Sequence, residues 1–217
     1  MKDLSIYQFL ESTASPDPVP GGGSVSALCG ALAAALGEMV ARLTIGRKRY
    51  AEHEEIMKKL VSELGDTRDT LTDAIAEDAD SYRVLMDAFA LPKDTDEQKN
   101  VRARSIAVAT LGAAAVPFKV ARVTLELAYS LKTLAEKGNQ NCLSDAGVAM
   151  MNARTACIGA LMNVFINLGS LDMSLLDPVD RKRATDFGII AAETYKEITD
   201  LENKELENVI TKLTSNG

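Results

Sequence analysis

Tryptophan is absent from this chain of 217 residues, and aromatic residues make up only 5% of it, although 47% of the residues are hydrophobic. A core of this composition has to be aliphatic, with alanine and methionine filling close contacts between helices. Strand patterning is also absent, since apolar residues recur at helical spacing and nowhere alternate with polar ones over the length of a strand. We therefore predict an all-α helical bundle, formed as a single domain over residues 1–217.

Histidine is nearly absent, because His53 is the only one in the chain. It stands among Glu52, Glu54 and Glu55, where we expect it to be exposed, so a Ser–His–Asp triad, a Cys–His pair and a histidine metal site are not available within the chain. Neither a P-loop nor a dinucleotide-binding fingerprint occurs, because the glycines at Gly21–Gly23 follow no strand. A catalyst of this composition has to use carboxylates, amides, lysine, arginine or helix ends, and we expect no metal and no cofactor.

Positive charge is scarce, with 24 Lys and Arg against 31 Asp and Glu and a formal net charge of −7. This balance argues against a general binder of nucleic acid or of anionic membranes, and favours a small-molecule or protein partner. The three cysteines, an odd number without a C-x-x-C pair, fit free thiols in a reducing compartment. No signal peptide is recognisable over Met1–Leu10, so we expect a cytoplasmic protein.

A glycine-rich turn, Pro18-Val19-Pro20-Gly21-Gly22-Gly23-Ser24, leads into the apolar run Val25–Ala41. Ser24 is a good N-cap, so we expect the helix to begin at or near it, with free N–H groups able to bind an anion or a carbonyl. The alternative is a loop that only starts a helix. The apolar part of the run, Val25–Gly37, ends before Glu38 and is too short to cross a bilayer, which favours a buried central helix. Small residues recur along one face of this helix, where another helix can lie close: Gly23, Ala27, Gly30, Ala34, Gly37 and Ala41.

Further long helices are predicted from the spacing of apolar residues and from helix start and stop signals. A short helix around Leu4–Leu10 precedes the glycine-rich turn. The later helices are expected over Tyr50–Ala90, from Asp94 or Thr95 to about Glu136 with a kink or restart at Gly112 to Pro117, over Asp145–Leu168, and over Asp180–Leu213. The cationic run Arg47-Lys48-Arg49 is either a solvated face or a site for a carboxylate on a ligand.

The predicted helix over Asp145–Leu168 carries four polar residues on one face. With about 100° of turn per residue, Asp145, Asn152, Asn163 and Asn167 fall within about 60° of one another. Each residue alone is explained by hydrogen bonds between helices or by capping. Together, beside small residues that leave room, they favour a pocket for a flat heteroaromatic ligand.

Several of these stretches resemble the cyclodeaminase/cyclohydrolase family, which includes methenyltetrahydrofolate cyclohydrolases and the cyclodeaminase domain of formiminotransferase-cyclodeaminase. The similar stretches, in the family's order, are PVPGGGSVSA at Pro18–Ala27, LTIGRKRY at Leu43–Tyr50, LPKDTDEQK at Leu91–Lys99, AEKGNQNCLSDAGVA at Ala135–Ala149 and ALMNVFINL at Ala160–Leu168. The resemblance implies a homodimer of bundles with long antiparallel helices and a tetrahydrofolate derivative as substrate. It implies Asp145 as the catalytic residue and a folate site formed by Gly21, Gly22, Gly23, Ser24, Lys48, Asn141, Ser144, Asn163 and Asn167.

Two reactions fit the resemblance. A cyclohydrolase adds water to the carbon that bridges N5 and N10 of 5,10-methenyltetrahydrofolate and yields 10-formyltetrahydrofolate. A cyclodeaminase forms the same methenyl compound from 5-formiminotetrahydrofolate and releases ammonia. We favour the cyclohydrolase, because this sequence contains no formiminotransferase domain. A non-catalytic scaffold dimer that uses the long helix over Tyr50–Ala90 is a further alternative.

Overall fold

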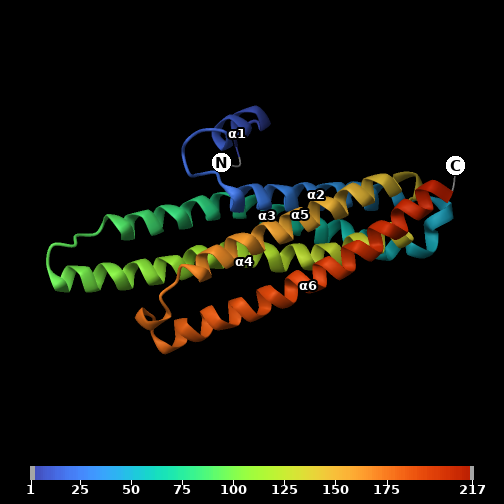
Figure 1. Cartoon of the computed structure of the whole chain (residues 1–217). Helices are drawn as coiled ribbons and strands as arrows, with labels where there is room; N and C mark the ends of the chain where they lie inside the picture. Colours follow the sequence, from blue (N-terminus) through green and yellow to red (C-terminus); the bar gives the residue numbers. More distant parts are fainter. Residues whose placement is uncertain (1–2, 216–217) are drawn as a thin grey trace.

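The computed structural model describes residues 3–215 and contains six α-helices within that range. They are α1 (Ile6–Thr13), α2 (Gly22–Thr44), α3 (Glu54–Ala90), α4 (Asp96–Lys137), α5 (Leu143–Gly169) and α6 (Pro178–Ser215). Three short 3₁₀ turns lie between them: η1 (Lys48–His53), η2 (Gln140–Cys142) and η3 (Met173–Leu175). No strand occurs over residues 3–215, so the all-α prediction is confirmed. Helices α2 to α6 run lengthwise in a bundle, and α1 lies outside it beside α2 (Figure 1).

Helix α4 begins and ends at the predicted residues. Thr95 is its N-cap, and its Oγ1 accepts a hydrogen bond of 3.2 Å from the Gln98 N–H, while Gln98 Oε1 accepts one of 3.1 Å from the Thr95 N–H. This reciprocal pair is a capping box. At the other end, the Gly138 N–H donates to Leu134 O at 2.8 Å. A Cβ on Gly138 would lie 2.5 Å from that same oxygen, so this close approach requires glycine.

Of the kink or restart predicted at Gly112 to Pro117, the restart is wrong, because α4 is one helix of 42 residues with Pro117 inside it. Proline has no N–H, so the carbonyl four residues earlier, Ala113 O, loses its partner within the helix. Asn167 of α5 supplies the missing donor, since its Nδ2 lies 3.2 Å from Ala113 O. A hydrogen bond between helices thus satisfies the carbonyl that Pro117 leaves free.

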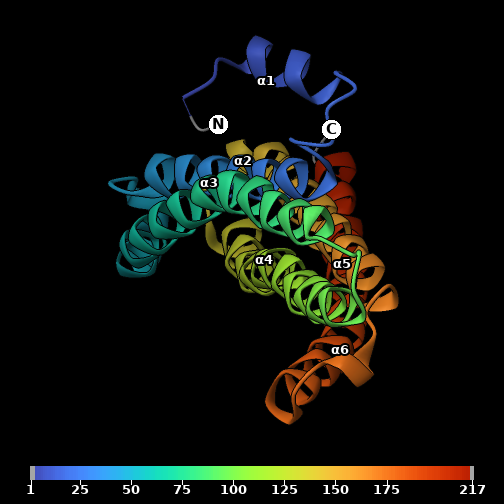
Figure 2. The same cartoon turned by 90° about the vertical axis from the view of Figure 1, so that its left-hand side faces the viewer.

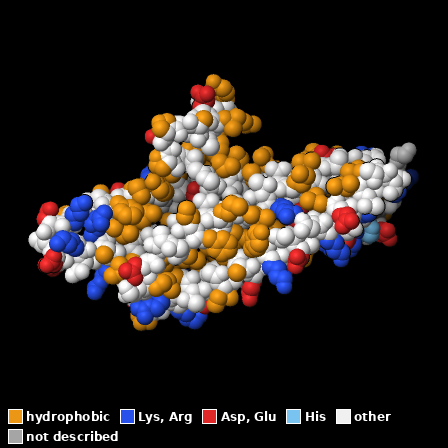
Figure 3. Space-filling view, in the orientation of Figure 1, with side chains coloured by type: hydrophobic (Ala, Val, Ile, Leu, Met, Phe, Trp, Pro, Cys, Tyr) orange, Lys and Arg blue, Asp and Glu red, His pale blue; other side chains and the backbone are white. Residues whose placement is uncertain are grey.

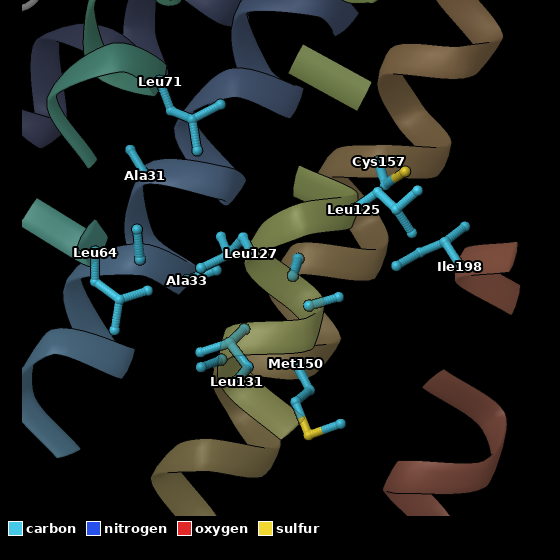
Figure 4. Packing of buried hydrophobic residues seen from close by; sticks show 14 of the residues in the cluster. Ala31, Ala33, Leu64, Leu71, Leu125, Leu127, Leu131, Met150, Cys157 and Ile198 are labelled. Atoms are coloured by element: carbon cyan, nitrogen blue, oxygen red, sulfur yellow. The ribbon is translucent and has the colours of Figure 1, made fainter. Parts of the chain in front are cut away.

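The core is built around the small-residue face of α2. A Cβ on Gly30 would lie 2.9 Å from Thr124 Cγ2, and one on Gly37 would lie 2.6 Å from Leu131 Cδ2, so no larger residue fits at either position without a shift. Leucines from α3 and α4 lie around the alanines of α2 (Figure 4). The predicted close packing against this face is confirmed.

Helices α2 and α5 pack side by side in antiparallel directions. Gly22, at the start of α2, lies beside Asn163, and a Cβ there would be 3.3 Å from Asn163 Nδ2. At the opposite end of α2, Thr44 Oγ1 accepts a hydrogen bond of 2.9 Å from the Asn139 N–H just before α5. Helix α6 lies on the other side of α4 and α5 from α2 and α3 (Figure 2).

The outward face of the α2/α5 pair exposes large apolar side chains. They are Leu32, Met39 and Leu43 on α2 and Val148, Met151, Met162, Phe165 and Ile166 on α5. Hydrophobic side chains gather on the middle of the side that shows α5 in Figure 1 (Figure 3). Soluble monomers rarely expose such contiguous patches unless they bind something.

Three helical segments are long and apolar enough to cross a membrane by length and composition: α2, α4 and Gln140–Gly169. The expectation that the apolar run at α2 is too short is therefore wrong, because the helix extends over 23 residues. Glu38 does not interrupt it. Its carboxylate is buried and accepts hydrogen bonds from Arg42 at 2.6 Å and from Arg68 at 2.7 Å.

Candidate functional site

The glycine-rich turn positions the start of α2, whose N-cap is Gly21. The prediction of Ser24 as the N-cap is wrong, because the helix begins one turn earlier and Ser24 is fully buried within it. Its hydroxyl points toward α3 and lies 2.9 Å from Asp78 Oδ2 and 3.1 Å from Ile75 O. Ser24 therefore joins α2 to a carboxylate on the neighbouring helix.

Asp78 is held against the backbone of α2. A Cβ on Gly23 would lie 2.1 Å from Asp78 Oδ1, so the carboxylate occupies the space that a side chain at position 23 would need. Burial raises the pKa of Asp78 above its usual range, and hydrogen bonds from the Ser24 hydroxyl and backbone N–H offset part of that rise in pKa. The start of α2 also stabilises negative charge at this point. The result is a partly buried carboxylate with a raised proton affinity.

A pocket of about 240 Å³ opens beside this carboxylate. Its walls come from the glycine-rich turn, α3, α4 and α5, and include Gly21, Gly22, Gly23, Asp78, Ser81, Tyr82, Leu85, Ala113, Asn163, Ile166 and Asn167. The structure thus brings the three predicted glycines together with Asn163 and Asn167. Ser24 joins them through its contact with Asp78.

The two asparagines of the pocket each use one side-chain N–H for the backbone. Asn163 Nδ2 donates to Gly159 O at 2.8 Å, and Asn167 Nδ2 donates to Ala113 O at 3.2 Å. Their amide oxygens have no hydrogen-bond partner within residues 3–215. These oxygens remain available to accept hydrogen bonds from a ligand.

The other predicted site residues lie at the far end of the α2/α5 pair. Lys48 is exposed in η1, Asn141 is exposed in η2, Ser144 is exposed in the first turn of α5, and Asp145 is half-buried in the same turn. Asp145 precedes Asn163 by 18 residues on one helix, so at about 1.5 Å per residue they lie about 27 Å apart along its axis. One copy of the chain therefore does not bring this group to the pocket.

Within one copy of the chain, the four polar residues on one face of α5, here called the polar seam, do not line a single pocket. Asn152 Nδ2 donates to Val148 O of its own helix at 2.9 Å, and Asn152 does not line the pocket. Only Asn163 and Asn167 of the four seam residues line it. Residues can share one face of a helix and still be several turns apart, which explains the difference.

Asp78 was missed by the sequence reasoning, although the sequence carries a signal for it. The residue falls within the apolar stripe of α3, seven residues after Leu71, three after Ile75 and seven before Leu85, all of which are buried. A carboxylate in the buried phase of a helix is costly unless it has a partner or a function. That position distinguishes Asp78 from the acidic residues on the solvated face.

The family model of formiminotransferase-cyclodeaminase matches residues 5–182. The chain is 43% identical over 168 residues to the methenyltetrahydrofolate cyclohydrolase of Methylorubrum extorquens, covering 77% of this chain and 81% of that protein. It is 36% identical over 166 residues to the formimidoyltransferase-cyclodeaminase of Mus musculus, but spans only 31% of that longer protein.

A solved structure has the same fold. The crystal structure of formiminotetrahydrofolate cyclodeaminase from Thermotoga maritima superposes with a TM-score of 0.80 and 30% sequence identity, covering 96% of this chain and 98% of that one. The resemblance inferred from the sequence motifs is therefore confirmed. This chain belongs to the formiminotransferase-cyclodeaminase family.

Proposed function

We propose that this protein is a methenyltetrahydrofolate cyclohydrolase, which hydrolyses 5,10-methenyltetrahydrofolate to 10-formyltetrahydrofolate. The proposal rests on the pocket, which brings together the carboxylate of Asp78, the amides of Asn163 and Asn167 and the start of α2. It is supported by the 43% identity to the methenyltetrahydrofolate cyclohydrolase of Methylorubrum extorquens. The pterin ring system has N–H donors and a carbonyl. Asn163 and Asn167 offer acceptor oxygens to the donors, and N–H groups at the start of α2 suit the carbonyl.

Asp78 is the group that we assign to proton transfer. The bridging carbon of the substrate carries positive charge, which a nearby carboxylate stabilises. As water adds to that carbon, Asp78 accepts one of its protons, and the hydroxyl remains on a neutral tetrahedral adduct. When the bond from carbon to N5 breaks, the proton on Asp78 moves to N5. The hydroxyl proton leaves to solvent as the formyl carbonyl forms, so the balance is one proton released.

The formiminotetrahydrofolate cyclodeaminase reaction is the second candidate. The Thermotoga maritima protein favours it, because that chain has nearly the same extent as this one and carries the name of a cyclodeaminase. The lack of a formiminotransferase domain in this sequence therefore does not discriminate between the two reactions. In this alternative, Asp78 protonates the departing ammonia at a similar tetrahedral carbon. A purely scaffolding role leaves the pocket and its buried carboxylate without a purpose.

A homodimer is part of the proposal, with the exposed apolar face of α2 and α5 as its interface. A two-fold axis perpendicular to α2 and through its middle would make the partner's α2 antiparallel to the α2 of the first copy. The Lys48, Asn141, Ser144 and Asp145 end of one copy would then approach the pocket of the other. This arrangement lets Asp145 act in catalysis and the remaining three contact folate, as the family resemblance implies.

We also propose a cytoplasmic location without membrane insertion. Cys29, Cys142 and Cys157 are free thiols, as a reducing compartment would keep them. Burial raises the pKa of Cys157 to about 11, so its thiolate is scarce at neutral pH. The apolar stretch of α2 that is long enough to cross a membrane is 61% buried inside the protein, where it packs against α3 and α5.

The test is the loss of 5,10-methenyltetrahydrofolate absorbance with and without the purified protein. Acceleration by the wild type supports the cyclohydrolase. If there is none, ammonia release from 5-formiminotetrahydrofolate tests the second candidate, and failure of both, with no thermal shift by folate, leaves the scaffold. Asp145→Asn should keep the fold and lose most of the turnover, and a fully active variant would remove Asp145 from the mechanism.

A further inference from the structure

A second cavity, of about 640 Å³, adjoins the pocket between α3 and α4. Ser81 lines both, so the two spaces meet at this residue. The pocket alone, at about 240 Å³, is smaller than the roughly 300–1,000 Å³ of sites that enclose a whole ligand of this size. A folate therefore needs more space than the pocket beside Asp78 supplies.

The walls of the second cavity are mainly apolar. Val84 and Ala88 line it from α3, and Val108 and Ala109 line it from α4. Val84 is 58% exposed and Val108 is 52% exposed, so both present apolar surface to whatever occupies the space. A surface of this kind suits a flat apolar ring.

Among the residues that the structure describes, Arg104 is the single charged one on these walls. Its side chain is exposed and has no ion pair or hydrogen-bond partner within residues 3–215. The neighbouring Arg102, in contrast, donates to Phe89 O at 3.1 and 3.2 Å and so connects the start of α4 to the end of α3. An unpaired guanidinium beside an apolar cavity is suited to a carboxylate, which it can bind in a bidentate manner.

The order of these features along α4 matches a ligand with three parts. Ala113 lines the pocket, and Arg104 lies nine residues earlier, about 13 Å away along the helix axis at about 1.5 Å per residue. Between them lie the apolar residues Val108 and Ala109. The sequence of polar pocket, apolar cavity and guanidinium corresponds to a pterin, an aminobenzoyl ring and a glutamate.

We propose that this second cavity binds the aminobenzoyl-glutamate part of the folate and that Arg104 pairs with a glutamate carboxylate. The inference rests on the proposed function, whose pocket holds the pterin end. It assigns Arg104 to substrate binding and not to the chemical step. Loss of Arg104 should therefore change KM and leave kcat nearly unchanged.

The experiment compares Arg104→Gln with the wild type on two substrates, 5,10-methenyltetrahydrofolate and the analogue that lacks the glutamate, methenyltetrahydropteroate. We expect KM for the folate to rise about tenfold or more, as for loss of a charge-assisted pair, with KM for the pteroate unchanged. Arg122→Gln is the matched control, because Arg122 is exposed on the same helix and, within residues 3–215, pairs only with Glu126, at 3.8 Å. Equal KM values for Arg104→Gln and the wild type on the folate would overturn the proposal.

A second variant tests the cavity itself. A Cβ on Gly112 meets no atom within 4 Å, and Gly112 lines the cavity, so Gly112→Leu should fill the space without a clash in the core. Leucine also favours the helix over glycine, so the fold should persist. We expect KM to rise for both substrates, and unchanged values would contradict a ring in this cavity.

Calorimetry with p-aminobenzoylglutamate separates this inference from the proposed function. Binding to the wild type and its loss in Arg104→Gln would support the tail site even in a protein without cyclohydrolase activity. Turnover of folate without any effect of either variant would leave the proposed function in place and refute the tail site.

Discussion

Asp78 is partly buried and Glu202 is fully buried, and a comparison of their surroundings distinguishes a carboxylate in a candidate site from one without access to a ligand. Burial raises the pKa of both Asp78 and Glu202, that of Glu202 to about 8. Asp78 lines a pocket and lies 2.9 Å from a serine hydroxyl. Glu202, on α6, exposes none of its surface, and neither of its oxygens has a hydrogen-bond partner within residues 3–215. A raised pKa marks a functional carboxylate where a ligand can reach it, so access and not the shift in pKa identifies the site.

Replacing each carboxylate by its amide should give the largest contrast. Asp78→Asn keeps the shape and removes the proton acceptor, so we expect turnover to fall about 10²–10⁴-fold with the fold retained. Glu202→Gln is the matched control, a change of the same kind at a buried site that no substrate reaches, and its turnover should stay near the wild-type value. Initial rates on methenyltetrahydrofolate and circular dichroism measure the two effects. If Asp78→Asn were as active as Glu202→Gln, the distinction between the two regions would fail.

Gly23→Ala should disturb the Asp78 region by moving the carboxylate without removing it. The new Cβ would lie 2.1 Å from Asp78 Oδ1, and because that atom ends a side chain, the carboxylate can shift while the helices stay in place. A displacement of about 1 Å at a reacting group can cost about 10²-fold in rate, which is the loss we expect in kcat. Gly22→Ala is the control, since its Cβ would be 3.3 Å from Asn163 Nδ2 and needs only a small adjustment. Equal rates for the two variants would show that the position of Asp78 is not critical.

The sequence was sufficient for most of the fold because the signals for the helices are local. The capping box at Thr95 and Gln98 and the close of α4 at Gly138 depend on residues within one turn of each other. The continuation of α4 through Pro117 could not be predicted in this way. It depends on Asn167, fifty residues later, which donates to the carbonyl that the proline leaves free.

The candidate site was predicted only in part, because residues on one face of a helix can lie far apart along its axis. The glycines of the turn and Asn163 and Asn167 do line one pocket. Helical periodicity tells which residues share a face but not how α2, α3 and α5 align. It therefore grouped Asp145 with Asn163, although the rise of about 1.5 Å per residue separates the two by about 27 Å along α5. Asp78 reaches the pocket only through the packing of α3 against Gly23, which no local pattern encodes.

The pH dependence of stability gives a further test of the difference between Asp78 and Glu202, through the cost of charging Glu202. Its pKa in the folded protein, about 8, lies above the ordinary value of 4.5, so the folded state binds its proton more tightly than the unfolded state does. Protonated Glu202 therefore stabilises the folded state relative to the charged form. This stabilisation is complete below about pH 4.5 and is lost as the pH rises toward 8. Above that pH the carboxylate is charged, and it has no hydrogen-bond partner among residues 3–215. Glu202→Gln cannot ionise, so at pH 9 it should be more stable than the wild type by about 1–3 kcal/mol, with little difference at pH 4.5. Urea denaturation at both pH values measures this, with Glu207→Gln as the control because Glu207 is exposed on the same helix. A gain in stability of the same size at both pH values would mean that the introduced amide simply packs better and that the charge of Glu202 carries no cost.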